Sequence, residues 1–283
     1  ATDEEKWLVV DGLQRLSALK HFVSDKSDKR LRLCGLEYLT GLEGKTYDKL
    51  ERRYQRRIEE TQVTVYLIEK GTPLEVKYNI FKRINTGGVP LSNQEIRHAL
   101  NPGKGAKFLA KLAASQEFKQ VVQLGESKKK RMDDREFILG FLAFRLTSYK
   151  NYQDGNRDSF LSEALFKANK LEDEELSVIE IDFHKAMIAV VEIFGDYAFR
   201  KIYKKKKRKQ PLNKSLFEIW SVNLSYLSEL QIEALKNNRQ RLIDLFINYI
   251  DTDQEFLASI SQAAKKVKYR FSTIEKIIQE VLS

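Results

Sequence analysis

Amphipathic helices dominate this sequence after Pro102, and they set the main limit on what it can fold into. Apolar residues recur there at the three- and four-residue spacing of a helix that buries one face. The pattern predicts helices over 107–114, 133–149, 158–169, 174–203, 213–230, 231–249 and 271–282. No convincing internal repeat accompanies them. We therefore expect a large all-α domain over 103–283.

The first hundred residues mix strand and helix patterns. An apolar run at 7–10 is followed by Asp11-Gly12 and then by a helix pattern over 13–23, which predicts strand, turn and helix. A second strand is predicted over 63–69, and Pro73 opens a helix that continues to Ile84. Because two strands alone are marginal in water, we expect partner strands upstream and a sequence that starts inside its domain. The fold class is therefore α+β, with a small, partial α/β domain over 1–102.

Ser92 and Glu95 give the clearest local signal. They have the S-x-x-E spacing of a capping box, in which each side chain satisfies a backbone N–H of the other residue. This predicts a short helix from Ser92 through Leu100, ending before Asn101-Pro102-Gly103.

The charge balance favours anionic partners. The chain has 50 Lys and Arg against 40 Asp and Glu, a formal net charge of +10, so nucleotides and nucleic acid head the candidates. The run over 200–209 has eight basic residues and no acid, and its segment Lys204, Lys205, Lys206, Lys207, Arg208 and Lys209 is the predicted DNA contact. A solvated loop explains the run equally well.

Other classes of site are excluded or disfavoured. One cysteine, Cys34, cannot form an internal disulfide, and three scattered histidines offer no zinc spacing and no histidine nuclease finger. The longest apolar runs, such as Phe137–Phe144, are too short to cross a bilayer, so we expect no membrane contact and a cytoplasmic location.

The segment Asp11-Gly12-Leu13-Gln14-Arg15 is the strongest candidate for chemistry. A helix start presents unpaired N–H groups, Gly12 permits close approach of an anion, and Arg15 offers a guanidinium that matches phosphate. Asp11 is a candidate to hold a metal ion or a water molecule. The alternative is purely local: Asp11 as an N-cap, Gln14 in the reciprocal position, and an Asp11–Arg15 pair.

A second candidate follows the helix that ends near Ile84. In the segment Arg83, Ile84, Asn85, Thr86, Gly87 and Gly88, successive glycines allow a backbone nest for an anion, and Arg83 and Thr86 add side-chain donors. A glycine C-cap is the alternative. Arg97, on the next short helix, is a candidate to face the same pocket.

These motifs resemble the N-terminal domain of GmrSD-type restriction enzymes, which is related to ParB and sulfiredoxin folds. Residues 7–16 look like the family's D-G-Q-Q-R-L segment, and residues 80–88 with 91–97 look like its R-I-N-T-G-G and Q-E-I-R blocks. Residues 131–136 and 211–222 also look like stand-alone members, so the resemblance covers nearly the whole chain. Leu13 replaces the first glutamine of the motif, and the upstream P-x-Q-R type segment is not present. In the family that segment helps to complete the pocket, so the chain alone is not certain to turn over nucleotide.

The resemblance implies a ParB-like domain that binds and hydrolyses a nucleoside triphosphate with a divalent cation such as Mg²⁺, in defence against foreign or modified DNA. Asp11, Gln14 and Arg15 would be catalytic, with Asp11 at the metal. Gly12, Arg83, Asn85–Gly88 and Arg97 would bind nucleotide. The family's histidine nuclease domain is absent from this sequence, so cleavage would need a nuclease partner. A non-catalytic DNA-binding or regulatory protein of the same fold is the alternative.

Overall fold

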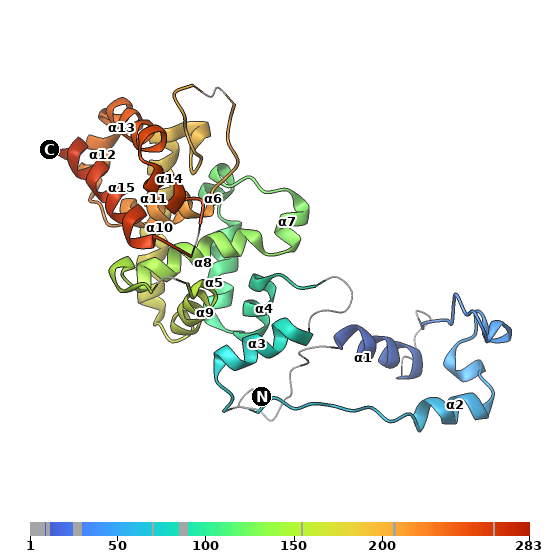
Figure 1. The fold of residues 1–283 in the computed structure, drawn as a ribbon. Coiled ribbons are helices and arrows are strands. Elements are labelled where there is room, and N and C mark those ends of the chain that lie inside the picture. The colour runs from blue at the N-terminus through green and yellow to red at the C-terminus, as the bar shows by residue number, and fades with distance from the viewer. Residues whose placement is uncertain are drawn as a thin grey trace. The chain divides into compact units, whose positions relative to one another are not determined.

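The chain forms two compact units, residues 1–88 and residues 89–283, each taken by itself below (Figure 1). The computed structural model describes residues 9, 12–24, 30–69, 71–84, 90–153, 155–205, 208–262 and 264–283. Their regular structure is helical, apart from an isolated antiparallel bridge between Arg200 and Leu212. The large helical domain is thus confirmed, and the boundary near residue 102 stays a prediction, because compactness and family membership divide a chain on different grounds.

The first unit has short helices with few buried side chains. Its elements are α1 (Leu13–Leu19), a π-helix (Lys20–Ser24), 3-10 turns (Thr40–Leu42 and Tyr47–Lys49), α2 (Arg52–Glu59) and α3 (Leu74–Ile84). The helix predicted after Pro73 is therefore confirmed. The ring of Phe22 meets that of Tyr47 edge-on, with centroids 5.9 Å apart, and so holds the π-helix to the second 3-10 turn.

The strand predicted over 63–69 is wrong for this structure. The segment 61–69 has no assigned secondary structure, and its apolar side chains are open to solvent, with Val65 68% and Tyr66 91% exposed. A strand needs a hydrogen-bonded neighbour, which no alternation of side chains can supply by itself. Of the strand predicted over 7–10, only Val9 lies within the described residues, so that prediction remains open.

The apolar stripe of α1 is also more exposed than its spacing predicts. Leu13 is 63% exposed, and Leu16 and Leu19 are each 45% exposed. Leu13 was expected to fit a buried helix face, and that expectation is wrong here. Helical spacing shows which face is apolar, and packing decides whether another element covers that face.

The second unit carries the helical domain. It contains α4 (Asn93–Leu100), α5 (Lys104–Ala114), α6 (Gln116–Val121), α7 (Glu126–Lys130), α8 (Asp133–Leu146), α9 (Arg157–Ala168), α10 (Asp173–Phe194), α11 (Lys214–Ser225), α12 (Glu229–Asn237), α13 (Arg239–Thr252), α14 (Gln254–Ser259) and α15 (Val267–Leu282).

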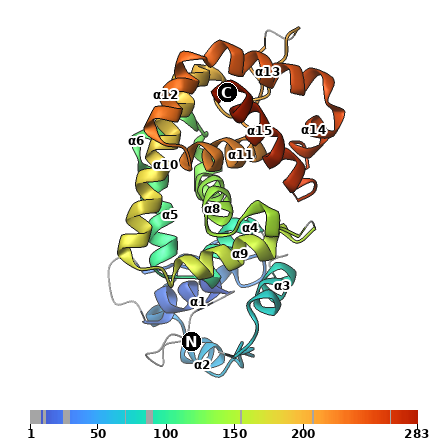
Figure 2. The ribbon, with the colours of Figure 1, turned by 90° about the vertical axis from the view of Figure 1, so that its left-hand side faces the viewer.

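Helices α8 and α11 form the centre of this unit (Figure 2). All residues over 137–144 are buried, so the longest apolar run is core on every side. On α11, Phe217 and Trp220 are 0% and 1% exposed, and Phe217 meets Phe137 edge-on with centroids 5.2 Å apart. Helices α10 and α15 also pack against α11. None of the described helices is long and apolar enough to cross a membrane.

The predicted helices are confirmed in place, and three of them end earlier than predicted. Helix α10 stops at Phe194, because Gly195 takes a positive φ of 53°, a conformation that breaks a helix. The stretch 213–230 ends at Ser225, since Ser228 and Gln231 form a new capping box that starts α12. The single helix predicted over 231–249 is two helices that meet at Asn238.

Candidate functional site

The turn before α1 brings two of the predicted site residues together. Gly12 is the N-cap residue and has a φ of 86°, in the left-handed region that favours glycine. A Cβ atom on Gly12 would lie 3.3 Å from the guanidinium Nη2 of Arg15, so this side chain folds back over the backbone of the turn. Arg15 and Gln14 are both exposed, whereas Asp11 lies outside the described residues. The turn therefore carries a cation directly over a helix start.

Helix capping does not account for Gln14 in this structure. With Gly12 at the N-cap, the helix start has no side-chain cap, and the third helical position is occupied by Arg15. Gln14 thus does not stand at the reciprocal position of a capping box. Its exposed amide remains available to a ligand, and its role stays a prediction.

An open apolar groove runs beside Arg15. It is lined by Ala18, Leu19, Phe22, Leu31 and Leu33, with Arg15 and Arg32 contributing the charged side chains. The groove lies within the first unit, between α1 with its π-helix and the segment 31–33. Such a lining suits the flat apolar part of a ligand whose charged part is held by arginine.

The second predicted anion loop lies largely outside the described residues. Arg83 is exposed in the last turn of α3, while Asn85, Thr86, Gly87 and Gly88 lie outside. The description resumes at Pro90, and the predicted capping box is confirmed at Ser92. The backbone N–H of Ser92 donates to Glu95 Oε2 at 2.6 Å, and that of Glu95 donates to Ser92 Oγ at 3.2 Å.

Arg97 belongs to the second unit and is buried there. It is 1% exposed, and its Nη2 lies 3.4 Å from Asp158 Oδ1 and 3.9 Å from Glu136 Oε1. Asn93 also donates to Asp158, from Nδ2 to Oδ1 at 3.2 Å. These contacts tie α4 to α8 and α9, so the geometry gives Arg97 a structural role inside the helical unit. Its predicted contact with nucleotide stays a prediction.

The basic run forms a loop whose base is fixed. Arg200 bridges Leu212, and the N–H of Asn213 donates to the carbonyl of Phe199 at 2.9 Å. From this base, Lys204, Lys205, Arg208 and Lys209 extend as exposed side chains, while Lys206 and Lys207 lie outside the described residues. The Nζ of Lys209 lies 3.5 Å from Asp196 Oδ1. The described cations are thus placed where a polyanion could reach them.

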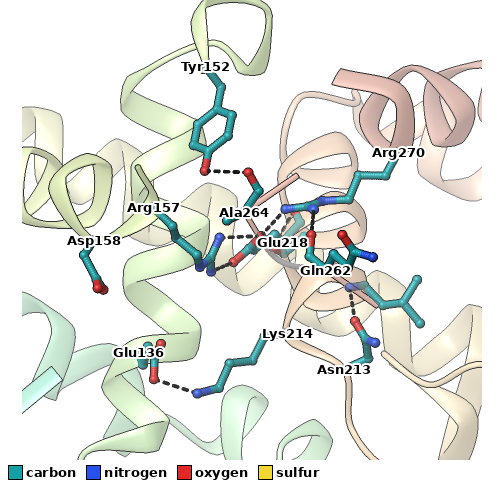
Figure 3. Close-up of polar contacts among 12 residues, drawn as sticks. Glu136, Tyr152, Arg157, Asp158, Asn213, Lys214, Glu218, Gln262, Ala264 and Arg270 are labelled. Carbon is teal, nitrogen blue, oxygen red and sulfur yellow. Dashed lines mark hydrogen bonds and ion pairs between the residues drawn. The ribbon is translucent and has the colours of Figure 1, made fainter. Parts of the chain in front are cut away.

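The sequence did not predict an ionic cluster at the centre of the helical unit. Arg157 of α9 and Arg270 of α15 converge on Glu218 of α11 (Figure 3). Glu218 Oε2 accepts from Arg270 Nη2 at 3.2 Å and from Arg157 Nη1 at 3.4 Å, and Arg157 Nη2 bonds its Oε1. The side chains of Arg157, Glu218 and Arg270 are 13%, 2% and 0% exposed.

Backbone carbonyls complete the surroundings of Arg270. Its Nη1 donates to the carbonyls of Ser259 at 3.1 Å, Gln262 at 3.4 Å and Lys265 at 3.4 Å, which lie between α14 and α15. Burial lowers the pKa of Arg270, against the opposing charge of Glu218. Burial also works against the charge of Arg157, but Glu218 outweighs it and raises the pKa of that guanidinium. The cluster holds three helices and one loop in a single arrangement.

Glu136 and Lys214 form a second pair at the edge of this cluster. Lys214 Nζ lies 2.6 Å from Glu136 Oε2 (Figure 3). Burial alone would raise the pKa of Glu136, but the charges of Lys214, Arg97 and Arg157 outweigh it and lower that pKa. Because all these carboxylates are matched by cations inside the protein, the cluster suits stability better than catalysis.

One sequence signal could have found this cluster. Glu218 stands in an otherwise apolar helix segment, between Phe217 and Ile219, and a charge on a buried helix face requires a partner. No spacing pattern identifies that partner, since Arg157 and Arg270 lie 61 and 52 residues away along the chain.

Metal binding by the described residues has no structural support. No group of three or more His, Cys, Asp or Glu side chains in the described part of the chain could hold a metal ion. Asp11, the predicted metal ligand, lies outside that part, so its role stays a prediction.

Comparison with known proteins gives one match. Residues 1–101 match the family model described as GmrSD restriction endonuclease, N-terminal domain. That range includes the turn at Gly12, the segment 83–88, and the whole of α4. Among curated proteins and among solved structures, no match was found. The resemblance expected for residues 131–136 and 211–222 lies beyond the matched range and stays a prediction.

Proposed function

Because residues 1–101 belong to the N-terminal domain family of GmrSD restriction endonucleases, we propose that the chain is a nucleotide-binding, NTP-hydrolysing module of a DNA restriction or anti-phage defence system. The observation that carries this proposal is the guanidinium of Arg15, which lies over Gly12 at the start of a helix within the matched range. Backbone N–H groups and an arginine together form a strong phosphate site.

The residue roles follow from this placement. Gly12 lets the backbone approach a phosphate, Arg15 binds phosphate oxygens in a two-pronged contact, and Gln14 orients the attacking water. Arg83, Asn85, Thr86, Gly87 and Gly88 close the site from the second loop. The apolar groove beside Arg15 supports the proposal, since it offers a surface for the base.

A divalent cation such as Mg²⁺ belongs to the same proposal. Asp11 would hold it at the turn, and the cation would neutralise charge on the bound phosphates. The α/β part of the fold is proposed on the same ground. We infer a ParB/sulfiredoxin-like arrangement for residues 1–102 from their family, with its strands formed by residues other than those the structure describes.

DNA and a nuclease are the proposed partners. The family is that of a restriction endonuclease, and the matched range is described as its N-terminal domain alone. The exposed cations at 204, 205, 208 and 209 support contact with a phosphate backbone, which such residues bind without selecting bases. Cleavage would then be performed by a separate nuclease.

A second candidate function is favoured by one residue. Leu13 stands where the family motif has glutamine, and in the structure it is 63% exposed at the helix start. An apolar side chain at that position supports a non-catalytic DNA-binding or regulatory protein that binds nucleotide without turnover.

Phosphate release separates the two candidates. The full-length protein is incubated with ATP, GTP, CTP and UTP in turn, with Mg²⁺, and inorganic phosphate is measured. We expect release with at least one nucleotide, and a loss of at least tenfold in Arg15→Ala and in Asp11→Ala. The matched control is Arg57→Ala, an exposed arginine on α2 of the same unit. Binding without release would favour the second candidate. Hydrolysis unchanged in both site variants would show that the proposed site is wrong.

A further inference from the structure

The start of α4 is held by a residue from a distant part of the helical unit. Arg131, in the turn between α7 and α8, places Nε 3.3 Å from Glu95 Oε2 and donates from Nη2 to the carbonyl of Pro90. In return, Ser92 Oγ donates to the carbonyl of Arg131 at 3.0 Å. Glu95 Oε2 therefore serves two partners, the Ser92 N–H of the capping box and the guanidinium of Arg131.

The turn that carries Arg131 is shaped for these contacts. The N–H of Arg131 closes α7 by donating to the carbonyls of Lys128 at 3.1 Å and Ser127 at 3.3 Å. The next residue, Met132, has a φ of 58°, a left-handed conformation that is unfavourable for a residue with a Cβ atom. Such a conformation persists where surrounding contacts hold it. Here the chain reverses, and both the carbonyl and the guanidinium of Arg131 reach α4.

The neighbouring cations do not share this arrangement. Lys128, Lys129 and Lys130 are exposed, and the Nζ of Lys129 pairs within its own helix with Glu126 at 2.8 Å. Arg131 is 36% exposed and its partner Glu95 only 15% exposed, measured on the side chains. A planar guanidinium can bond a carboxylate and a carbonyl at once, which a lysine ammonium at this place could not match in geometry.

We propose that Arg131 is a positioning residue for nucleotide binding, through its hold on Pro90, Ser92 and Glu95. The inference rests on the proposed function. Pro90 lies two residues beyond Gly88, so the contacts of Arg131 fix the chain immediately after the proposed phosphate loop. A loop anchored before the ligand arrives loses less conformational freedom on binding, and its affinity is correspondingly higher. Arg131 itself touches no nucleotide in this scheme.

The test measures nucleotide affinity of the full chain by calorimetric titration with ATP and with GTP, each with Mg²⁺. We expect Arg131→Ala to bind about tenfold more weakly than the parent, the loss typical of a charge-assisted hydrogen bond. Arg131→Lys should be intermediate. Lys128→Ala removes the same charge from the same turn and should bind as the parent does. Ile138→Val, a core change in α8, lowers stability without touching the contacts of Arg131 and should also leave affinity unchanged.

Amide hydrogen exchange gives a second readout without nucleotide. Exchange over 92–96 should be faster in Arg131→Ala, and unchanged in Lys128→Ala. If the parent binds nucleotide and Arg131→Ala binds it equally well, the inference is wrong while the proposed function stands. An equal loss in Ile138→Val would also overturn it, since general destabilisation would then explain the effect. If the parent binds none of the nucleotides, the proposed function fails and the inference fails with it.

Discussion

Replacing Gly140 by alanine should destabilise the helical unit, although alanine is the better helix former. Gly140 lies inside α8, where alanine is favoured over glycine by about 1 kcal/mol. In this position, however, an added Cβ would lie 2.6 Å from Glu218 Oε1 and 3.0 Å from its Cγ. Helix propensity and packing therefore act in opposite directions at one residue.

Packing should win, because Glu218 has no free direction in which to move. Its carboxylate is held by Arg157 and Arg270, and ordinary contact with the new Cβ requires a shift of several tenths of an ångström. Overpacking of this kind costs about 1–3 kcal/mol, and loosening a buried ion pair adds to that cost. After the gain from helix propensity is subtracted, we expect the free energy of unfolding to fall by about 1–3 kcal/mol.

Urea unfolding followed by far-UV circular dichroism measures this loss. Gly125→Ala is the control, since a Cβ on Gly125 meets nothing within 4 Å and its φ is −66°. That variant should stay within about 0.5 kcal/mol of the parent. The decisive comparison is Gly140→Ala on a Glu218→Ala background, where the obstacle is gone and alanine should be neutral or stabilising. A gain in stability in the parent background, or an equal cost in both backgrounds, would refute this reasoning.

Three further outcomes are expected. Glu218→Gln keeps the size of the side chain but leaves Arg157 and Arg270 without their countercharge, so it should lower the free energy of unfolding by about 3–5 kcal/mol, whereas Lys209→Gln breaks an exposed pair and should cost at most about 1 kcal/mol; equal losses in urea unfolding would contradict this. The hydrogen bond that Tyr269 donates to Asp253 Oδ2 at 2.6 Å raises the pKa of Tyr269 to about 12. Because the folded state then holds this proton more tightly than the unfolded state, whose pKa is near 10, stability should be constant below pH 10 and fall between pH 10 and 12, with a smaller fall in Tyr269→Phe; identical pH profiles would count against it. Replacing Lys204–Lys207 with glutamine should weaken binding to unrelated DNA duplexes about equally and reduce the salt dependence by about 0.9 for each phosphate that the protein no longer neutralises, without changing nucleotide turnover in the absence of DNA; a variant with the affinity and salt slope of the parent would make the run a solvated loop.

Local signals in the sequence were sufficient where one short segment contains all the partners. The capping box of α4 needs only Ser92 and Glu95, and both the spacing and the hydrogen bonds agree. The buried run 137–144 and the helix after Pro73 were likewise predictable, because helical hydrogen bonds close within four residues. The motif at Gly12 and Arg15 also led to the family now matched over residues 1–101.

Only the tertiary structure decided what depends on distant residues. The segment 63–69 has the composition of a strand, but a strand forms only beside a partner, and none is assigned to it. Arg97 carries the same charge whether it faces a ligand or the core, and its burial against Asp158 could not be read from spacing. Arg131 reaches Pro90 across 41 residues, and Arg270 reaches Glu218 across 52. The sequence determined the helices and the local turns because their hydrogen bonds are short-range, whereas packing alone decided which charges meet, since the fold brings them together only after those helices have formed.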